Sequence, residues 1–276
     1  MSRLKCRLIV DPPAAGCWNM AVDQALLELA QVPVLRLYRW ATPTLTLGYF
    51  QSLRDRRQHE SSLDCPVWRR STGGGAIVHD QELTYSLILP ANEVHGSSAD
   101  YYERVHGVAA SILSERGQMA LLHPVRPGFD GSESGDMPAE SATKHRTGKS
   151  ASEPFLCFQR RASGDLILWV PSETGPSGTG HKILGSAQRK RDGAILQHGS
   201  ILLRRSEQAP ELSGINDFLS PERRWDFAEF GEQFADRVLA SFGWTKQPSQ
   251  LSDAEAELAQ RFQRERFSKA DWTGMR

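Results

Sequence analysis

The chain has 276 residues, enough to build a sizeable core as one large domain or two modest ones. Its 33 basic and 33 acidic residues balance, and this argues against a general nucleic-acid binder, which normally carries a basic excess. Short basic clusters at residues 54–57, 189–191 and 204–205 are typical of solvated faces, and together they offer a dock for an acidic partner protein.

The N-terminal sequence MSRLKCRLIVDPP has neither the apolar run nor the cleavage site of a signal peptide. No stretch reaches the roughly 18 uninterrupted apolar residues that a membrane helix needs. The sequence therefore predicts a cytoplasmic protein without a membrane or nucleic-acid partner. Cys6, Cys17, Cys65 and Cys157 form no CxxC pair, so no zinc site is expected, and the first three are interpreted as structural.

Strands and helices are both predicted in the first half of the chain. The apolar runs at residues 4–10 and 34–39 predict strands, and the alternation in TLTLGYF predicts a half-buried one. Between the first two, NMAVDQALLELA predicts a helix that Asn19 caps. After a glycine-rich run, LTYSLIL alternates as a strand should, and apolar residues from 101 to 112 recur at helical spacing.

Three later segments differ in composition. Residues 127–154 are rich in Ser, Gly and charge, so we expect a flexible insertion there. Residues 171–180 predict a soft, elongated hairpin loop. The C-terminal part, residues 227–267, has helical periodicity and a capping-box pair at Ser252 and Glu255. Since strands and helices do not alternate regularly, the sequence predicts an α+β (mixed α/β) fold.

The glycine-rich run, RRSTGGGAIVHD, covers residues 69–80. Consecutive glycines allow close backbone approach, and their N–H groups can form a nest for an anion. The run matches neither GxxxxGK[ST] nor a GxGxxG that opens a helix, because no lysine follows it and strand-like residues come next. A triple glycine between strands is by itself more typical of a turn, whereas Arg69, Arg70 and His79 nearby favour a site.

A second stretch, KILGSAQRKRDGAILQHGSILL, covers residues 182–203. Lys182 begins a segment that ends in Gly-Ser-Ala-Gln, and after a turn an apolar strand carries His198. Together with NMAVDQAL, RWATPTLTLGYFQ, the glycine run and HDQELTYS, this stretch resembles the biotin/lipoyl protein ligase superfamily, in its lipoate–protein ligase and octanoyltransferase branch. The resemblance covers most of the chain except the insertion.

The resemblance implies one catalytic domain over residues 1–276, with a mixed sheet flanked by helices, as in class II aminoacyl-tRNA synthetases and biotin–lipoyl ligases. It also implies a narrow acyl tunnel in which the glycines let backbone pass close beside the acyl chain. Arg70 and His79 are expected at the tunnel mouth, and Lys182 near the acyl carbonyl. The substrate-binding residues that the matching motifs imply are Arg70, Gly73, Gly74, Gly75, Ala76, His79, Gly185, Ser186, Ala187, His198 and Gly199.

Members of this branch acylate a lysine of lipoyl domains, such as the glycine cleavage H protein or the E2 subunit of 2-oxoacid dehydrogenases. One kind activates free lipoate with ATP and Mg²⁺. Another takes octanoyl from acyl carrier protein through a cysteine thioester, without a nucleotide. A third moves octanoyl between lipoyl domains, also through a cysteine.

Cys157, in EPFLCFQRRASGDLILWV, resembles the cysteine-plus-Phe segment of the carrier-protein transferases. A free thiol is mostly protonated at neutral pH, and a nearby ammonium favours the thiolate. Lys182 lies 25 positions later, yet a hairpin over residues 165–184, oriented by Asp165, can join the two. Lys182 would then favour the thiolate, hydrogen-bond the acyl carbonyl, or both. Backbone N–H groups of the glycine loop or of a Gly-Ser-Ala turn would stabilise the oxyanion.

The leading hypothesis is therefore an octanoyl-[acyl-carrier-protein]:protein N-octanoyltransferase with Cys157 and Lys182 as catalytic residues and no metal or cofactor. An ATP- and Mg²⁺-dependent lipoate ligase is the nearest alternative. Gly75 favours it, because the similar transferases often have arginine there. An amidotransferase between lipoyl domains and a non-catalytic binder of acyl groups or lipoyl domains also stay open.

Overall fold

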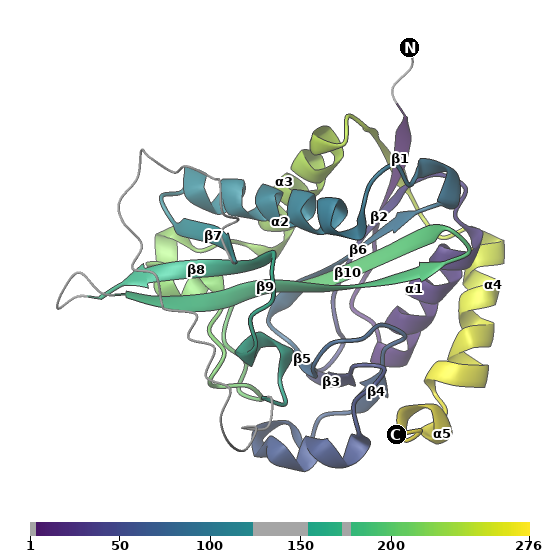
Figure 1. Cartoon of the computed structure of the whole chain (residues 1–276), viewed down its shortest axis with the longest axis horizontal. Coiled ribbons are helices and arrows are strands. Elements are labelled where there is room, and N and C mark those ends of the chain that lie inside the picture. Colours follow the sequence, from purple (N-terminus) through teal and green to yellow (C-terminus); the bar gives the residue numbers. More distant parts are fainter. Residues whose placement is uncertain (1–3, 124–153, 173–177) are drawn as a thin grey trace, which may run out of the picture.

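A mixed sheet dominates the computed structural model of the chain, which describes residues 4–123, 154–172 and 178–276. The strands are β1 (Lys5–Val10), β2 (Val34–Tyr38), β3 (Thr44–Leu47), β4 (Val67–Arg69), β5 (Ile77–His79), β6 (Glu82–Leu89), β7 (Met119–His123), β8 (Asp165–Pro171), β9 (Gly178–Arg191), β10 (Ala194–Leu202) and β11 (Thr245–Ser249). Within the described residues, eight of them form one sheet in the order β11-β1-β2-β6-β10-β9-β8-β7, and the order β4-β3-β5 forms a smaller sheet beneath it (Figure 1).

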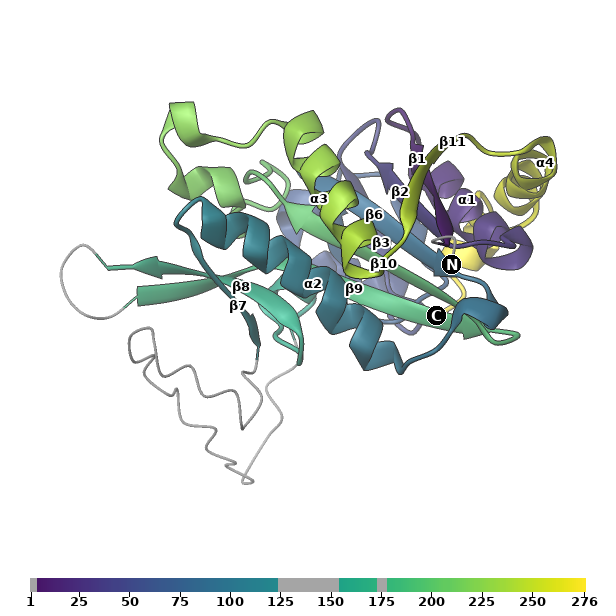
Figure 2. The same cartoon turned by 90° about the horizontal axis from the view of Figure 1, so that it is seen from above.

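Helices cover both faces of the large sheet (Figure 2). The helices are α1 (Gly16–Leu29), α2 (Ser98–Glu115), α3 (Phe227–Ser241), α4 (Asp253–Phe262) and α5 (Ala270–Thr273). Short 3-10 helices are η1 (Leu53–Gln58), η2 (Glu60–Ser62), η3 (Ala91–Glu93), η4 (Cys157–Gln159), η5 (Ile215–Phe218) and η6 (Pro221–Arg223), and η7 (Gln263–Phe267) is a π-helical turn. This architecture confirms the predicted mixed fold.

The core around the large sheet has two layers, one on each side, and a third apolar cluster surrounds the small sheet. Apolar residues of α2 and α3 pack with β6 and β9 in one cluster, and those of α1 and α4 pack with β2 on the other side. Because both faces are covered, every residue of β6 is buried. Its alternation separates an apolar face from a polar face that is also buried, where Thr84 and Ser86 hydrogen-bond to other side chains. In the small sheet, the strand predicted in TLTLGYF is confirmed as β3, but it is fully buried, so the predicted half-burial is wrong.

The first helix begins earlier than predicted. It starts at Gly16 after Ala15, whose side chain cannot cap it, and Asn19 lies inside the helix. Asn19 is fully buried, where its amide donates to the Arg39 carbonyl and its side-chain oxygen accepts from Arg36. The polar side chain therefore serves a tertiary network rather than the helix terminus. The capping box of Ser252 and Glu255 is confirmed at the start of α4.

The C-terminal part, predicted as helical over residues 227–267, contains α3, α4 and η7, but it also contains a strand. That strand, β11, pairs in parallel with β1 at the edge of the sheet. It is largely exposed and holds Pro248, which an edge strand tolerates. TKQPS has no apolar alternation, so nothing in its local pattern indicated a strand.

The two soft segments lie largely outside the described residues. Of the predicted insertion at 127–154, only Pro154 is described, and residues 173–177 of the predicted loop at 171–180 are not. β8 and β9 pair on either side of that loop. The predicted turn at Gly185, Ser186 and Ala187 is wrong, because these residues continue β9 and pair with β10. None of the helices in the described part of the chain is both long and apolar enough to cross a bilayer.

Candidate active site

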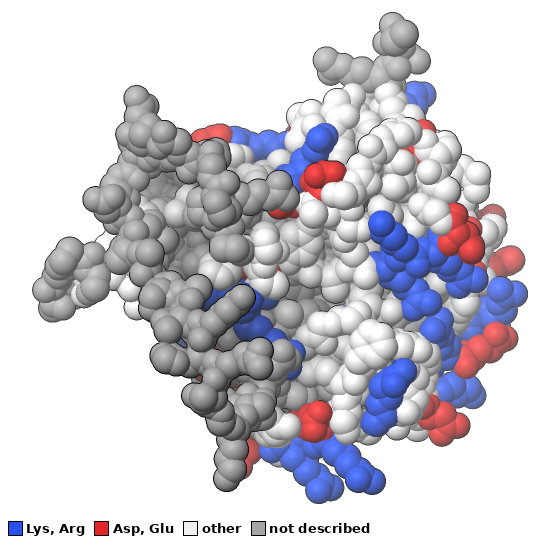
Figure 3. All heavy atoms as spheres, in the orientation of Figure 1, with Lys and Arg blue, Asp and Glu red and all other residues white. Residues whose placement is uncertain are grey.

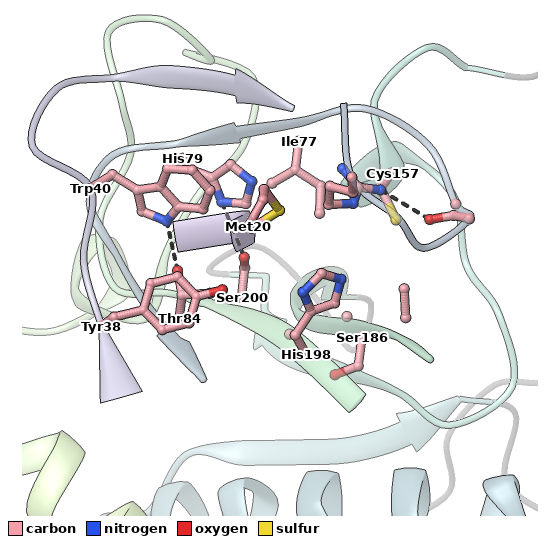
Figure 4. Close-up of a pocket in the computed structure, with 16 residues that line it drawn as sticks. Met20, Tyr38, Trp40, Ile77, His79, Thr84, Cys157, Ser186, His198 and Ser200 are labelled. Atoms are coloured by element: carbon pink, nitrogen blue, oxygen red, sulfur yellow. Dashed lines mark hydrogen bonds between the residues drawn. The ribbon is translucent and has the colours of Figure 1, made fainter. Parts of the chain in front are cut away.

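A small cavity lies between the strands β9 and β10 and the loop that leads from β4 to β5. It is lined by Met20, Tyr38, Trp40, Arg70, Gly73, Gly74, Ile77, His79, Thr84, Cys157, Gly185, Ser186, Ala187, His198, Gly199 and Ser200. Figure 4 shows Ile77, His79 and Cys157 on one side of this space and His198 and Ser186 on the other. The cavity volume is about 30 Å³, room for about two or three water molecules.

Most of the predicted site residues meet at this cavity. Ten of the thirteen line it, and the other three, Gly75, Ala76 and Lys182, are not part of the lining. The sequence did not single out Met20, Tyr38, Trp40, Ile77, Thr84 or Ser200, which complete the wall. Apart from Ser200, their side chains are apolar or β-branched and also suit a core, so no local pattern marks them.

Cys157 and Lys182 are in contact. The Lys182 Nζ lies 3.7 Å from the Cys157 Sγ and 3.2 Å from the Cys157 carbonyl oxygen. The β8–β9 hairpin brings them together, as the sequence predicts, because Lys182 on β9 pairs with Ile167 on β8. Cys157 begins η4 and is the one partly exposed thiol among the described cysteines, whereas Cys6, Cys17 and Cys65 are buried.

Asp165 fixes the Lys182 ammonium. Its Oδ2 lies 2.8 Å from Nζ, with both side chains almost fully buried. The same carboxylate accepts hydrogen bonds from the Tyr102 hydroxyl at 2.7 Å and from the Ala162 amide at 2.6 Å. An ammonium has three N–H donors, and Asp165, the Cys157 carbonyl and the Cys157 sulfur provide three acceptors. The buried ion pair therefore aims one donor at the thiol.

Backbone pairing holds Cys157 against the glycine loop. The Cys157 amide donates to the Ala76 carbonyl at 2.7 Å, and the Ala76 amide donates to Phe155 at 3.1 Å. A Cβ added at Gly75 would lie 2.9 Å from the Cys157 nitrogen and 3.0 Å from its Cα. Gly75 is thus required by the backbone of the cysteine segment. Contact with the cysteine segment is therefore a second reason for a glycine here, and the acyl-chain reason that the resemblance implied stays a prediction.

Arg70 organises the loop from inside. Its guanidinium donates to the carbonyls of Thr46, Gly73 and Gly75 at 2.9–3.1 Å and to the Thr46 hydroxyl at 2.7 Å. Burial lowers the pKa of Arg70 to about 10. The resemblance implied that Arg70 lies at the tunnel mouth. Arg70 is only 2% exposed, so it forms part of the cavity wall instead. Gly74 lies between Gly73 and Gly75, whose carbonyls Arg70 binds, and its φ of +92° is a conformation that favours glycine.

His79 is also buried in the wall rather than at the mouth. Its Nδ1 lies 2.6 Å from a Glu82 oxygen, its Nε2 lies 2.7 Å from the Thr46 hydroxyl, and its ring stacks on Trp40 at 3.9 Å between centroids. Burial lowers the pKa of His79. The neutral ring with a proton on Nδ1 satisfies both hydrogen bonds, so His79 joins the small sheet to β6.

His198 faces the cavity from β10 and links it to α1. Its Nδ1 lies 3.2 Å from Asp23 and its Nε2 lies 2.7 Å from the Thr72 hydroxyl, in the loop just before the glycines. Asp23 also binds Arg36 at 2.8 Å. Burial alone would raise the pKa of Asp23, but the His198 hydrogen bond and the Arg36 charge lower it overall. Sequence reasoning missed Asp23, although an aspartate within the apolar pattern of a predicted helix was the available signal.

Ser186 belongs to a second polar network, on the α2 side of β9. Its hydroxyl lies 2.7 Å from both the Tyr85 hydroxyl and the His106 Nε2, and its amide donates to Tyr102 at 3.1 Å. The His106 Nδ1 lies 2.7 Å from the Gly164 carbonyl, and burial lowers the His106 pKa to about 3. Because the Ser186 amide already has an acceptor, it cannot stabilise an oxyanion as the sequence suggested.

The glycine loop is better suited to that role. Gly73 and Gly74 line the cavity. Among the described residues, no hydrogen bond has the amide of Gly73, Gly74 or Gly75 as its donor. Such amides are able to bind a developing negative charge. In the same described residues, no three His, Cys, Asp or Glu side chains are grouped as a metal site requires.

Known proteins are similar to this chain in fold and in sequence. The chain matches the family described as the lipoyl protein ligase A/B catalytic domain over residues 16–263. Among solved structures, lipoate-protein ligase A bound with ATP has a TM-score of 0.69 and 17% identity, covering 99% of this chain and 100% of that one. A bi-partite lipoate protein ligase from Thermoplasma acidophilum has a TM-score of 0.67 and 17% identity, covering 100% of this chain and 98% of that one. These two similarities show the fold.

Curated relatives carry a more specific name. Octanoyltransferase LipM of Brevibacillus brevis is 30% identical over 96% of this chain and 97% of its own length. The protein of the same name from Carboxydothermus hydrogenoformans is 28% identical over 94% of each chain, and that from Macrococcus caseolyticus is 36% identical over 88% of this chain and 77% of its own. This chain therefore belongs to the lipoyl protein ligase A/B catalytic domain family, and it is an acyltransferase.

Proposed function

We propose that the chain takes octanoyl from octanoyl-acyl carrier protein onto Cys157 and passes it to a lysine of a lipoyl domain in the cytoplasm. The observation that carries this proposal is the 3.7 Å contact between the Cys157 sulfur and the Lys182 ammonium beside a mostly apolar cavity. The relatives named octanoyltransferase support octanoyl as the transferred group. A lipoyl domain as acceptor is supported by a structural neighbour studied with its E2 lipoyl domain.

In the first step, the Cys157 thiolate attacks the carbonyl carbon of the octanoyl thioester. The Lys182 ammonium stabilises the thiolate before attack. Amides of Gly73 and Gly74 stabilise the oxyanion while the new C–S bond forms. When the carrier C–S bond breaks, Lys182 gives a proton to the departing sulfur, and octanoyl remains on Cys157.

In the second step, the amine of the acceptor lysine attacks the octanoyl-Cys157 thioester. The proton that this amine loses returns to Lys182, the Cys157 C–S bond breaks, and an amide is the product. Thioester exchange is nearly isoenergetic and amide formation is downhill. Such two-step nucleophilic catalysis therefore needs no nucleotide.

Binding of the acyl chain requires the cavity to open, because about 30 Å³ is far less than eight carbons occupy. Met20 lines the cavity from α1. Its unbranched side chain has several rotatable bonds and fills irregular space, so it can yield more easily than a branched neighbour. We expect Met20 to move when the octanoyl chain enters between the glycine loop and β10.

The test is a measurement of intact mass after the enzyme is mixed with octanoyl-acyl carrier protein. The wild type should gain one octanoyl group and lose it when a lipoyl domain is added. Cys157→Ala should gain none. Cys65→Ala is a matched control that keeps the adduct, because Cys65 is a buried thiol away from the cavity.

Other outcomes identify the alternatives. Acylation of the lipoyl domain only with ATP, Mg²⁺ and free lipoate, unaffected by Cys157→Ala, would mean a lipoate ligase. An adduct that forms from an octanoylated lipoyl domain but not from the carrier would mean an amidotransferase. Retention of octanoate without turnover from any donor would mean a non-catalytic binder.

A further inference from the structure

A surface pocket lined by arginines lies at the η1 and α5 end of the molecule. Its lining is Ser52, Leu53, Arg54, Arg56, Arg57, Leu63, Gly274 and Arg276. Of these described lining residues, four are arginines and none is acidic. Figure 3 shows Lys and Arg side chains along the lower edge of this face, below the small sheet in the view of Figure 1. The sequence had marked residues 54–57 as a basic cluster, and the proposed reaction gives them no role.

The four arginines differ in what holds them. Arg56 donates to the backbone carbonyls of Leu63 and Cys65, so its charge is fixed on the pocket wall. Arg54 and Arg57 are exposed, and within the described part of the chain neither has an ion-pair partner at its side chain. Their charges are therefore uncompensated. The one carboxylate on η1 itself, Asp55, does not line the pocket.

Contacts connect this pocket to the cavity. The guanidinium of Arg276 lies 5.3 Å from the ring centroid of Phe50. Phe50 is 73% exposed, and its ring lies 3.9 Å from where a Cβ of Gly73 would be. Gly73 lines the cavity. A ligand whose acyl end enters beside Gly73 and whose stem crosses Phe50 would therefore meet the arginines next.

We infer that this arginine-lined pocket docks the acyl donor, an acidic carrier protein whose thioester arm bears a phosphodiester. The inference rests on the proposed function. Guanidinium groups bind phosphate oxygens and carboxylates in forked pairs. The exposed Phe50 ring provides an apolar contact for the stem of the arm between phosphate and thioester. Uncompensated positive charge at a site mouth also raises the rate of encounter with an anionic partner.

The acceptor fits this surface less well. A lipoyl domain must present a lysine amine to the same thioester, and a positive charge entering the site is repelled by the pocket. The donor instead brings its phosphate on the very arm that carries the acyl group. Charge complementarity therefore favours the donor.

The experiment separates the two half-reactions. Loading of Cys157 is measured by intact mass from octanoyl-acyl carrier protein and, separately, from the uncharged thioester octanoyl-N-acetylcysteamine. For Arg54→Gln/Arg57→Gln, kcat/KM for the carrier should fall about tenfold or more and lose its dependence on salt. Loading from the uncharged thioester should stay at the wild-type rate. Arg224→Gln, an exposed arginine beside α3, is the matched control.

Three results would contradict the inference or the proposed function on which it rests. Equal loading of the double variant and the wild type by the carrier contradicts docking. A defect confined to transfer from loaded enzyme to the lipoyl domain would assign the pocket to the acceptor instead. If the wild type loads from neither donor, the proposed function fails. Binding of the octanoyl-carrier to Cys157→Ala enzyme, with and without the two arginine substitutions, then still tests docking.

Discussion

The two walls of the cavity are built differently. Lys182 and Ser186 belong to β9, where Lys182 pairs with β8 beside a β-bulge and Ser186 pairs with β10, so backbone pairing within the sheet sets their positions. Cys157, the first residue of the short helix η4, and the glycines lie in loop segments outside the sheets. The Ala76 and Leu156 bridge and the guanidinium of Arg70 hold those loops in place. The reacting pair therefore joins a sheet wall to a loop wall.

The site should therefore be more sensitive to substitution on one wall than on the other. A sheet position tolerates the loss of one contact, because its neighbours in the ladder remain. The loop wall depends on a few contacts, each of which places Cys157 directly. A substitution that removes or displaces one contact should therefore lower the reaction rate more on the loop wall than on the sheet wall. The exception is a substitution that removes the reacting group itself.

Removal of the ammonium should have the largest effect. Lys182→Met leaves Asp165 buried without its ion-pair partner, so we expect a loss of about 3–5 kcal/mol in the free energy of unfolding. Loading of Cys157 should fall about 10²–10³-fold, because the group that stabilises the thiolate and moves the proton is gone. Urea denaturation and the mass assay measure the two effects.

The double variant Lys182→Met/Asp165→Asn separates them. Neutralising Asp165 removes the unpaired buried charge, so much of the stability should return while loading stays low. Wild-type loading by this double variant would show that the ammonium has no part in the reaction.

The loop wall is tested by Gly75→Ala. The added Cβ would meet backbone atoms of Cys157 at 2.9–3.0 Å, and these can move only if the cysteine segment shifts. A displacement of about 1 Å at the reacting sulfur costs about 10²-fold in rate, so loading should fall by about that factor. Gly107→Ala is the control, because a Cβ there meets nothing within 4 Å. Equal rates for both variants would mean that the loop wall yields without moving Cys157.

The smallest effect is a pH dependence of stability on the sheet side. His106, buried against Ser186, has a pKa lowered to about 3, against about 6.5 in an unfolded chain. Its contribution is fully present above pH 6.5 and is lost as the pH falls, because the unfolded state then binds a proton that the folded state does not. From pH 7 to pH 5 the wild type should lose about 2 kcal/mol through this group. His106→Gln should lack that part of the slope in urea denaturation, and an unchanged slope would contradict the assignment.

The local pattern of the chain was sufficient for most elements of the fold. The apolar spacing over residues 101–112 lies within α2, and the Ser252 and Glu255 pair begins α4. β11 was missed, since an exposed edge strand needs no apolar alternation. Asn19 was misplaced as a cap, because Arg36 from a distant strand captures its side chain.

The residues of the candidate site that lie in the sequence motifs could be predicted. The contact of Cys157 with Lys182 agrees with the expected hairpin. The residues that hold this pair in place were harder to predict. Asp165 was expected only to orient the hairpin, whereas in the folded chain it forms an ion pair with Lys182. The pairing of Asp23 with His198 across 175 positions likewise has no sequence period.

The mixed fold and the family motifs could be predicted from the amino-acid sequence, because both depend on residues near one another along the chain. The folded structure was needed to show why Gly75 must be glycine, which carboxylate holds the ammonium, and how Phe50 links Gly73 to a pocket lined by arginines. Each of these depends on segments that the folded sheet brings together, and contacts between distant segments leave no local pattern.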